Sequence, residues 1–366
     1  MSFNKKRYYS LDFIKTLAIF LVCFYHFSTI NVNFIEDRSI TAYVTYYIYG
    51  FSSICVPLFF MVNGALMLNK DYNFKVHIKK LINLIVLIFI WGAIQLLTYA
   101  IIYGDTYTIK SFIYGVLNWT KGRIDSLWFL QTLICLYIIF PIVKEIYDKE
   151  DKTLLNYMLF IVGLATFGLV FMNMCANVVQ WSVGKINLEG NFFNILMDPF
   201  NPFKGFRAYS LIYFIGGAIL INKIKENKIN ISNFKIGILL FLSLLLLFLY
   251  GVMMTFSNGR IYDTVFDGYG TIMTFTICVL VFIIAFRNEE KLVKLDPVIR
   301  VIGSNTLGIY LLQGMVGAYL RPIYKQISFN QNIFVNIIFT FIIVIICLFI
   351  TMTLKKIPII KKIFEM

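Results

Sequence analysis

Ionisable residues inside apolar sequence are the first candidates for chemistry, because a charge is costly to place in hydrocarbon. One apolar run near the N-terminus contains Asp12, Lys15 and His26. If this run is a helix, Lys15 and His26 lie within about 20° of a common face, and Asp12 lies about 40° from His26 on the other side. An imidazole is the usual general base at neutral pH. The spacing therefore predicts one helical stripe that carries a carboxylate, a cation and a candidate base.

Each of these three residues also has a simpler interpretation. Asp12 suits the first turn of a helix, where a carboxylate is favoured. Lys15 suits a lysine that extends to lipid headgroups. His26 lies about 16 Å from Lys15 along the helix, so we expect it to be deep in the span, where a satisfied core histidine is the alternative to a base. The sequence leaves both interpretations of each residue open.

The composition shows what must position this stripe. Of the 366 residues, 59% are hydrophobic and 14% are charged, against about 45–50% apolar and about 25% charged in soluble domains. Long apolar runs predict helices, the only spanning structure that satisfies its own backbone, and not a β-barrel. We expect an all-α polytopic membrane protein with about ten transmembrane helices in one domain over residues 1–366. The predicted windows are 11–31, 45–68, 81–103, 126–143, 154–175, 208–222, 236–256, 269–286, 300–320 and 333–354.

The lysines and arginines predict the orientation of these helices, because basic residues gather on the cytoplasmic side. With ten spans and the N-terminus inside, 22 basic residues fall in cytoplasmic segments and 10 in external ones. Both termini are then cytoplasmic, the first helix is retained, and the protein is a multi-pass protein of the inner (plasma) membrane. The net charge of +14 is mostly an orientation signal, so we expect no nucleic-acid partner.

The cysteines and the second histidine predict no metal site. All six cysteines lie in or beside apolar runs, without a CxxC pair or a Cys/His cluster, so we expect small core residues rather than disulfides or metal ligands. His77 lies in a basic segment before the third window, where we expect an exposed loop histidine.

Five segments resemble, in their order and spacing, the motifs of the acyltransferase family 3 membrane proteins, which include bacterial sugar O-acetyltransferases. The resemblance covers nearly the whole chain. The segments are the first-helix pair Lys15 and His26, segment 56–64 with Asn63, the basic pair Lys79 and Lys80, segment 126–130 with Trp128, and segment 303–313 with Asn305 and Gln313.

Three positions depart from the residues that the family usually carries. Lys15 stands where Arg is usual, which keeps the charge but loses the planar fork of a guanidinium. Asn63 stands where Ser is common, and Gln313 stands where His is frequent.

The resemblance implies acyl transfer from cytoplasmic acyl-CoA, usually acetyl-CoA, to a sugar hydroxyl of a cell-envelope glycan, with no tightly bound cofactor. The implied partners are acyl-CoA, a glycan or lipid-linked sugar acceptor, and membrane lipid. His26 would be the catalytic base, and Lys15, Lys79 and Lys80 would bind the donor. The residues expected to support or line the site are Asp12, Asn63, Trp128, Asn305 and Gln313.

Several of these residues have a second interpretation that the sequence leaves open. The topology signal accounts equally well for Lys79 and Lys80, an interfacial aromatic belt for Trp128, and interhelical hydrogen bonds for the buried amides. The longest external segment, 176–208, either receives a glycan or only connects two helices; its candidates are Trp181, Lys185, Glu189, Asp198 and Arg207.

The main rival function is a transporter or flippase of polysaccharides or small molecules. Such proteins often show internal repeats and paired broken helices, and this sequence shows neither. A non-catalytic envelope scaffold or sensor gives no reason for a histidine in register with a lysine. The acceptor glycan, and acetyl against succinyl as the transferred group, are open at the level of sequence.

Overall fold

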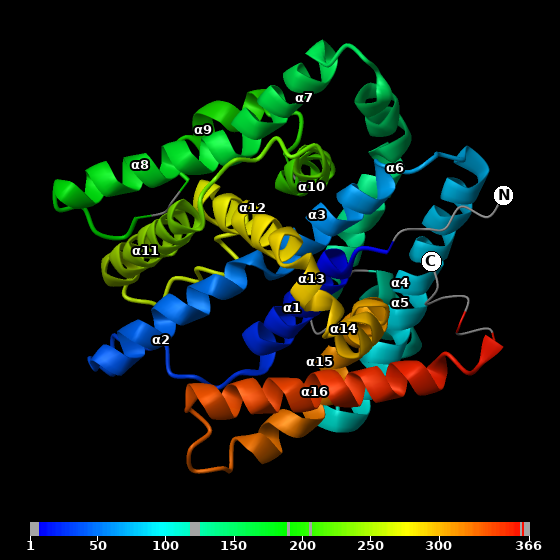
Figure 1. Cartoon of the computed structure of the whole chain (residues 1–366). Coiled ribbons are helices and arrows are strands. Elements are labelled where there is room, and N and C mark those ends of the chain that lie inside the picture. Colours follow the sequence, from blue (N-terminus) through cyan, green and yellow to red (C-terminus); the bar gives the residue numbers. More distant parts are fainter. Residues whose placement is uncertain (1–6, 118–124, 189–190, 205–206, 359–360, 362–366) are drawn as a thin grey trace. The chain divides into compact units, whose positions relative to one another are not determined.

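The structure is a computed structural model that describes residues 7–117, 125–188, 191–204, 207–358 and 361. As expected for an all-α protein, the regular elements of these residues are helices, and none is a strand (Figure 1). The chain forms two compact units. Unit 1 comprises Met1–Tyr25, Ile30–Asn69 and Asp151–Ser304, and unit 2 comprises His26–Thr29, Lys70–Glu150 and Asn305–Met366.

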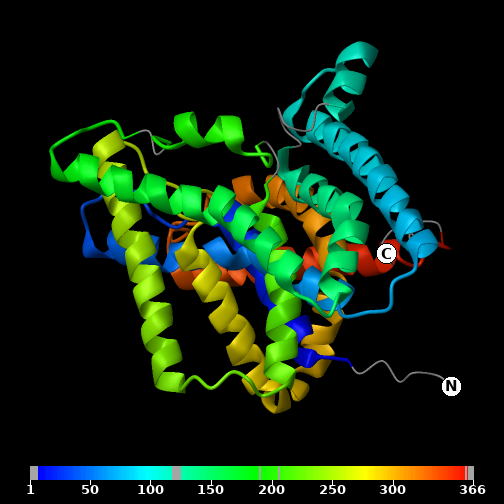
Figure 2. The same ribbon diagram turned by 90° about the horizontal axis from the view of Figure 1, so that it is seen from above.

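Unit 1 holds most of the first helix, the helices that follow it, and the middle of the chain. In Figure 2, α11 and α12 of this unit run beside each other. The helices, with three short 3₁₀ or π turns among them, are α1 Tyr9–Phe27, α2 Ile40–Gly50, η1 Phe51–Ile54, α3 Cys55–Met67, α7 Thr153–Gly163, η3 Leu164–Gly168, α8 Leu169–Ser182, α9 Asn194–Met197, η4 Asp198–Phe200, α10 Tyr209–Lys225, α11 Asn233–Asn258, α12 Ile272–Arg287, α13 Glu289–Val293 and α14 Asp296–Gly303.

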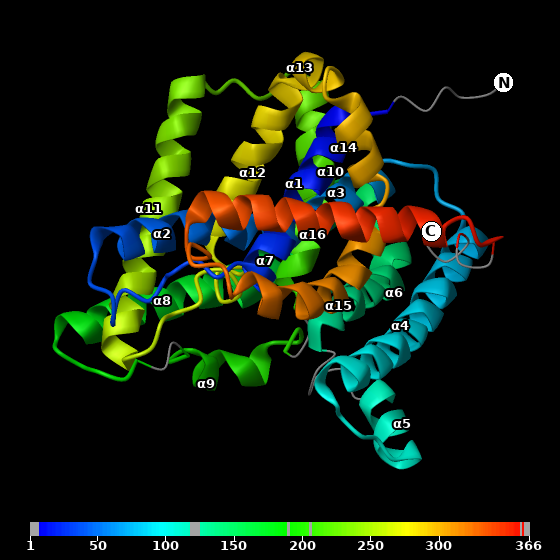
Figure 3. The same cartoon turned by 90° about the horizontal axis from the view of Figure 1, so that it is seen from below.

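Unit 2 is built on two pairs of neighbouring helices. In Figure 3, α15 and α16 lie along each other, and the short α5 folds back beside the end of α4. The elements are α4 Phe74–Tyr103, α5 Ile109–Leu117, η2 Asp125–Leu127, α6 Trp128–Asp148, α15 Thr306–Tyr324 and α16 Ile333–Leu354.

Every predicted apolar window contains a helix, and the described residues include seven helical segments long and apolar enough to cross a membrane. These are Tyr9–Phe27, Ile40–Met67, Phe74–Tyr103, Trp128–Asp148, Thr153–Ser182, Asn233–Asn258 and Ile333–Leu354. The windows at 208–222 and 269–286 correspond to shorter helices, of 17 and 16 residues. The window at 300–320 is broken between α14 and α15, at the segment from Gly303 to Thr306. The chain is therefore a multi-pass membrane protein, and a count of ten spans stays a prediction.

Two glycines allow the backbones of α3 and α10 to touch in the core of unit 1. A Cβ at Gly64 would overlap the carbonyl of Phe214, and a Cβ at Gly217 would overlap the carbonyl of Met61. Small residues at such crossings let membrane helices approach closely enough for dense van der Waals packing. Gly64 ends the motif segment 56–64, so this contact gives that motif glycine a structural reason.

The N-terminal part of α1 is anchored by α13 and α14 of the same unit. The carboxylate of Glu289 accepts hydrogen bonds from the backbone N–H groups of Tyr9 (2.8 Å) and Ser10 (3.0 Å) and so caps the helix. The hydroxyl of Thr16 donates to the carbonyl of Ile299 at 3.2 Å. A Cβ at Gly303 would lie only 3.0 Å from the carbonyl of Asp12, so this glycine lets α14 pack against the turn that carries Asp12.

Candidate functional site

The N-terminal turns of α1 hold a compact charge cluster. Asp12 is 5% exposed, and its Oδ1 lies 2.7 Å from Nζ of Lys15. Its Oδ2 accepts a hydrogen bond from Nε of Arg7 at 2.6 Å. One buried carboxylate thus faces two cations, which leaves the cluster with one net positive charge. Because Glu289 supplies the cap, the role of Asp12 in the structure is to hold these two cations in place.

His26 occupies the last turn of α1, and its side chain is exposed among the described residues. This corrects the expectation of an imidazole enclosed deep in an apolar span. The four residues before Tyr25, from Leu21 to Phe24, are buried. The exposure of His26 follows from its place at the end of the helix, since α1 stops at Phe27. Because the imidazole of His26 is exposed, a substrate can reach it.

The basic pair at the start of α4 belongs to unit 2. The side chains of Lys79 and Lys80 are both exposed there. The expectation for their neighbour His77 was wrong, because His77 is only 5% exposed. One of its ring nitrogens lies 2.8 Å from the carbonyl of Tyr137, and its ring stacks on Tyr137 and Phe140. His77 thus joins α4 to α6, and the basic segment in which it lies is helical from Phe74 onward rather than a loop.

The four remaining candidates occupy different settings. Asn63, half-buried on α3 of unit 1, donates to the carbonyl of Phe59 in its own helix at 2.9 Å. In unit 2, Trp128 is half-buried at the start of α6. Asn305 precedes α15 and accepts a hydrogen bond from Nζ of Lys355 at 2.7 Å. Gln313 is 2% exposed, and its Oε1 has no hydrogen-bond partner within the described residues.

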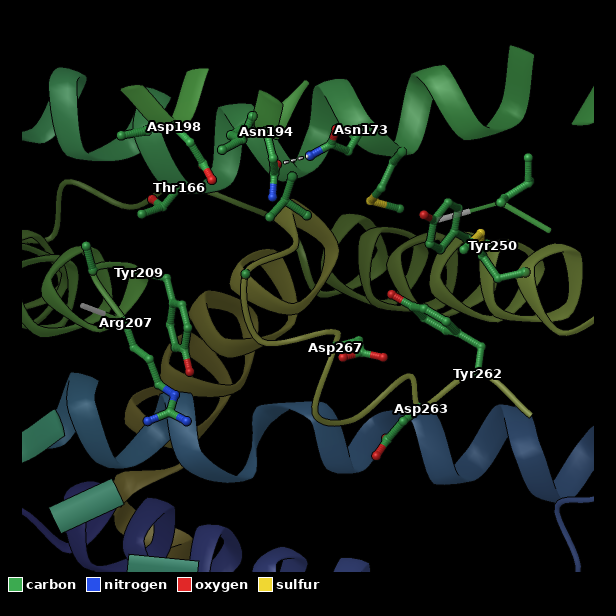
Figure 4. A pocket seen from close by; sticks show the side chains of 18 of the residues that line it. Thr166, Asn173, Asn194, Asp198, Arg207, Tyr209, Tyr250, Tyr262, Asp263 and Asp267 are labelled. Atoms are coloured by element: carbon green, nitrogen blue, oxygen red, sulfur yellow. Dashed lines mark hydrogen bonds between the residues drawn. The ribbon is translucent and has the colours of Figure 1, made fainter. Parts of the chain in front are cut away.

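Unit 1 also contains a polar cavity of about 880 Å³ (Figure 4). Its walls come from the π turn and α8, Leu188 and the segment 191–204, the start of α10, the end of α11, and the loop 259–271. The described lining includes four asparagines, three aspartates, three tyrosines and three cationic residues. Of the candidates in segment 176–208, Asp198 and Arg207 line this cavity, Trp181 and Lys185 are exposed elsewhere on that segment, and Glu189 lies outside the described residues.

The cavity wall is held together by amide side chains. Asn173 donates to Asn194 at 2.8 Å and accepts from the backbone N–H of Phe193 at 2.8 Å, which ties the segment after α8 back onto that helix. Asn201 donates to the carbonyl of Ala165 at 3.3 Å. Ala165 lies in the π turn η3, and such turns redirect backbone groups out of the regular helical pattern, often at functional sites.

Two aspartates of loop 259–271 differ sharply in how they are bound. Asp263 accepts hydrogen bonds from the Tyr25 hydroxyl at 2.6 Å and from the backbone N–H groups of Val265 and Phe266 at 2.9 and 3.1 Å. The side chain of Asp267 has no hydrogen bond or ion pair within the described structure and is exposed to the cavity. Asp263 therefore shapes the loop, whereas Asp267 is available to a ligand.

The surroundings of Asp267 change its acidity. The atoms around the cavity partly desolvate its carboxylate, and the nearby charge of Asp263 adds to this, so that the pKa of Asp267 rises to about 6 despite the opposing effect of Arg260. Among the cations, Lys204 forms an ion pair with Asp198 at 3.1 Å. Arg260 is exposed and has no ion pair with any described residue.

The residues of loop 259–271 were not among the candidates expected from the sequence. The available signal was a short polar segment with two aspartates, an arginine and two tyrosines between two apolar windows. That composition is common in external loops, so only the convergence of this loop with α8 and the start of α10 reveals a cavity. Neither the cavity nor any other part of the described chain gathers three His, Cys, Asp or Glu residues that could hold a metal ion, and the six cysteines are thiols rather than disulfides.

Comparison with known proteins agrees with the resemblance carried by the motifs. The model of the acyltransferase domain family known as acyltransferase 3 matches residues 8–354, which is nearly the whole chain. No curated protein and no solved structure shows significant similarity to this chain. The family match favours acyl transfer over the transporter and scaffold alternatives, and the apolar helices agree with a membrane enzyme. The chain therefore belongs to the acyltransferase 3 family and is a membrane-embedded O-acyltransferase.

Proposed function

We propose that this enzyme transfers an acyl group, with acetyl as the expected group, from cytoplasmic acyl-CoA to a hydroxyl of a cell-envelope or exported polysaccharide sugar. The observation that carries the proposal is helix α1. One end holds the cationic cluster of Arg7, Asp12 and Lys15, and the other end exposes His26. Acyl transfer from acyl-CoA to a hydroxyl calls for a base and for a cation near the CoA phosphates, and this helix offers a candidate for each.

In the proposed reaction, His26 acts as the general base. A neutral imidazole nitrogen accepts the proton of the sugar hydroxyl as its oxygen attacks the thioester carbonyl carbon. The tetrahedral intermediate collapses, the carbon–sulfur bond breaks, and the imidazolium returns its proton to the CoA thiolate. The products are the O-acyl sugar and free CoA, and His26 is neutral again. A positioned base of this kind typically accelerates a reaction by about 10²–10⁴-fold.

The donor would bind with its phosphates near the cationic cluster. Charge-assisted hydrogen bonds from lysine and arginine are strong contacts for phosphate oxygens. Lys15 lies about 16 Å from His26 along α1, and the pantetheine arm of CoA separates its thioester from its diphosphate. A donor held at Lys15 therefore extends its thioester toward the other end of the helix. Lys79 and Lys80 are further candidates for the phosphates, because both side chains are exposed.

The proposal includes the orientation of the chain. Both termini face the cytoplasm, ten helices cross the inner (plasma) membrane, and the acyl group passes from a cytoplasmic donor to an external sugar. The distribution of lysine and arginine supports this orientation, with 22 such residues in segments predicted to be inside and 10 in segments predicted to be outside. Asn63, Trp128, Asn305 and Gln313 stay as candidate supporting residues, and the orphaned Oε1 of Gln313 makes it the strongest of these.

The test is His26→Ala, with Ser28→Ala as the matched control. Ser28 is half-buried just beyond the same helix end and lies two residues from His26. Cells that lack the gene would be complemented with each variant, and O-acyl groups on the envelope polysaccharide would be measured by mass spectrometry at matched protein levels. We expect His26→Ala to lower acylation by at least about a hundredfold and Ser28→Ala to leave it unchanged. Near wild-type acylation by a normally inserted His26→Ala protein would remove His26 from the reaction.

A further inference from the structure

We infer that the polar cavity of unit 1 is the acceptor site, and that it takes a hydroxyl-rich sugar whose hydroxyl groups donate hydrogen bonds to the carboxylate of Asp267. The inference rests on the proposed function for the reaction itself, and it deepens that function by placing the acceptor. Four observations support it: the place of the cavity along α11, the hydrogen bond between Tyr25 and Asp263, the polar and aromatic lining, and the carboxylate of Asp267, unpartnered within the described residues.

The position of the cavity follows from the helices that lead to it. Helix α11 starts at Asn233, near the end of the basic segment 223–235, and lines the cavity at Tyr250, Met254 and Asn258. The rise from Asn233 to these residues is about 26–38 Å, a range that contains the hydrocarbon thickness of about 30 Å. The cavity therefore lies one membrane thickness away from a segment with four basic residues. If that segment is cytoplasmic, the cavity faces outside, where envelope polysaccharides are.

The cavity wall is joined to the helix that carries the proposed base. The hydroxyl of Tyr25 donates to Oδ2 of Asp263 at 2.6 Å, and Asp263 lines the cavity. Tyr25 directly precedes His26 in α1. The hydrogen bond thus connects loop 259–271 to the last turn of α1.

The lining has the chemistry of a sugar site rather than a lipid site. Tyr209 and Tyr262 present ring faces and hydroxyls toward the same space as Asp267 (Figure 4). Aromatic faces pack against the C–H faces of sugar rings, while carboxylates and amides bind their hydroxyls. The volume of about 880 Å³ lies within the usual range of about 300–1,000 Å³ for ligand pockets. A second cavity of unit 1, of about 460 Å³, is lined almost wholly by apolar side chains of α7, α10 and α12 and lacks these groups.

Asp267 is the lining carboxylate best placed to bind the sugar. Asp198 is paired with Lys204, and both oxygens of Asp263 already accept hydrogen bonds. Asp267 has neither kind of partner within the described structure, so its oxygens are free to accept from a ligand. A sugar hydroxyl that reaches Asp267 would replace the water that otherwise solvates this carboxylate.

The acidity of Asp267 predicts how acceptor affinity depends on pH. Because the pKa of Asp267 is about 6, its carboxylate is mostly ionised above pH 6 and accepts hydroxyl hydrogen bonds most strongly there. The charged and titratable groups that face it are Asp198, Lys204, Arg207, Tyr209, Tyr250, Arg260, Tyr262 and Asp263. Affinity should therefore rise as the pH increases through about 6 and then level off.

The experiment measures acceptor binding apart from catalysis. The probe is a set of oligosaccharides released from the envelope of cells lacking the gene and de-esterified by mild alkali, which frees the acceptor hydroxyls. Titration calorimetry with the full-length protein in lipid nanodiscs gives the Kd of wild type, Asp267→Asn and the control Asp71→Asn at pH 5 and pH 7.5. Asp71 is exposed, lies in unit 2 and has no hydrogen bond or ion pair with a described residue.

We expect Asp267→Asn to raise the Kd about tenfold or more at pH 7.5, because a hydrogen bond to a charged group is lost. The same variant should lose the difference between the two pH values, and Asp71→Asn should behave as wild type. Equal Kd values for wild type and Asp267→Asn would overturn the inference, as would a wild type that acylates envelope sugar without binding these oligosaccharides. Intact binding with no transfer from acyl-CoA would instead refute the proposed function and leave the site in place.

Discussion

Replacing Lys15 by glutamine tests whether the charge cluster of α1 binds the donor. Asp12 is buried and lies 2.7 Å from Nζ of Lys15 and 2.6 Å from Nε of Arg7. In Lys15→Gln, Arg7 still neutralises this carboxylate, so no buried charge is left unpaired. The side chains of Lys15 and Arg7 are 20% and 43% exposed, and partly exposed ion pairs contribute about 1 kcal/mol or less to stability. We therefore expect the variant to fold and insert normally.

The expected effect is on the use of acyl-CoA. Lys15→Gln changes the net charge of the cluster from +1 to zero, because Arg7 and Asp12 then cancel. A lost hydrogen bond between charged groups costs about 1.5–3 kcal/mol, and each 1.4 kcal/mol is a factor of about ten. Asp12 already compensates part of the charge of Lys15, which places the effect at the lower end. We expect the apparent KM for acyl-CoA to rise about tenfold, while Lys15→Arg stays close to wild type.

The assay is acyl transfer in membranes with labelled acyl-CoA over a range of concentrations, at matched protein levels. Lys235→Gln is the control, because Lys235 is an exposed basic residue in a segment also predicted to be cytoplasmic. If Lys15 only anchors the chain at the lipid surface, both variants should change insertion to the same small degree and leave the KM unchanged. A saturation curve for Lys15→Gln that superimposes on the wild-type curve would refute donor binding by Lys15.

Two further predictions concern the fold. Gly64→Ala should lower the stability of the detergent-solubilised protein by about 1–3 kcal/mol, because its methyl group would overlap the carbonyl of Phe214; thermal unfolding measures this, and Gly237→Ala, with open space around it, should be neutral. A Gly64→Ala protein as stable as wild type would contradict the close crossing of α3 and α10. Single cysteines in an otherwise cysteine-free chain should react with an impermeant reagent in intact cells within 191–204 but not within 223–235 or 287–300. Labelling within 287–300 would break the ten-span topology.

The positions of the helices could be predicted from the sequence because hydropathy is a local property. Each apolar window contains a helix, and the break near Gly303 follows from residues that are poor helix formers. The common helical face of Asp12, Lys15 and His26 could also be predicted, since it depends only on helical periodicity. The family resemblance rested on the order of short motifs, and the match over residues 8–354 confirms it.

The environments of individual side chains could not be predicted in this way. His77 was expected in a loop and lies buried against Tyr137, because α4 begins earlier than its apolar window and packs on α6. His26 was expected to be enclosed and is exposed, because α1 ends one residue later. In both cases, the deciding factor is where a helix stops and which neighbour covers it.

The sequence by itself determined that the chain is a helical membrane enzyme of a known family, because hydropathy, basic residues and motif spacing are all written along the chain. Only the tertiary structure decided why Gly64 and Gly303 are glycines, which group caps α1, and that Asp263 is bound while Asp267 has no side-chain partner within the described residues. These features depend on contacts between segments up to about three hundred residues apart, such as the cap that Glu289 places on Tyr9. Such contacts follow from the packing of whole helices, which no local pattern of residues specifies.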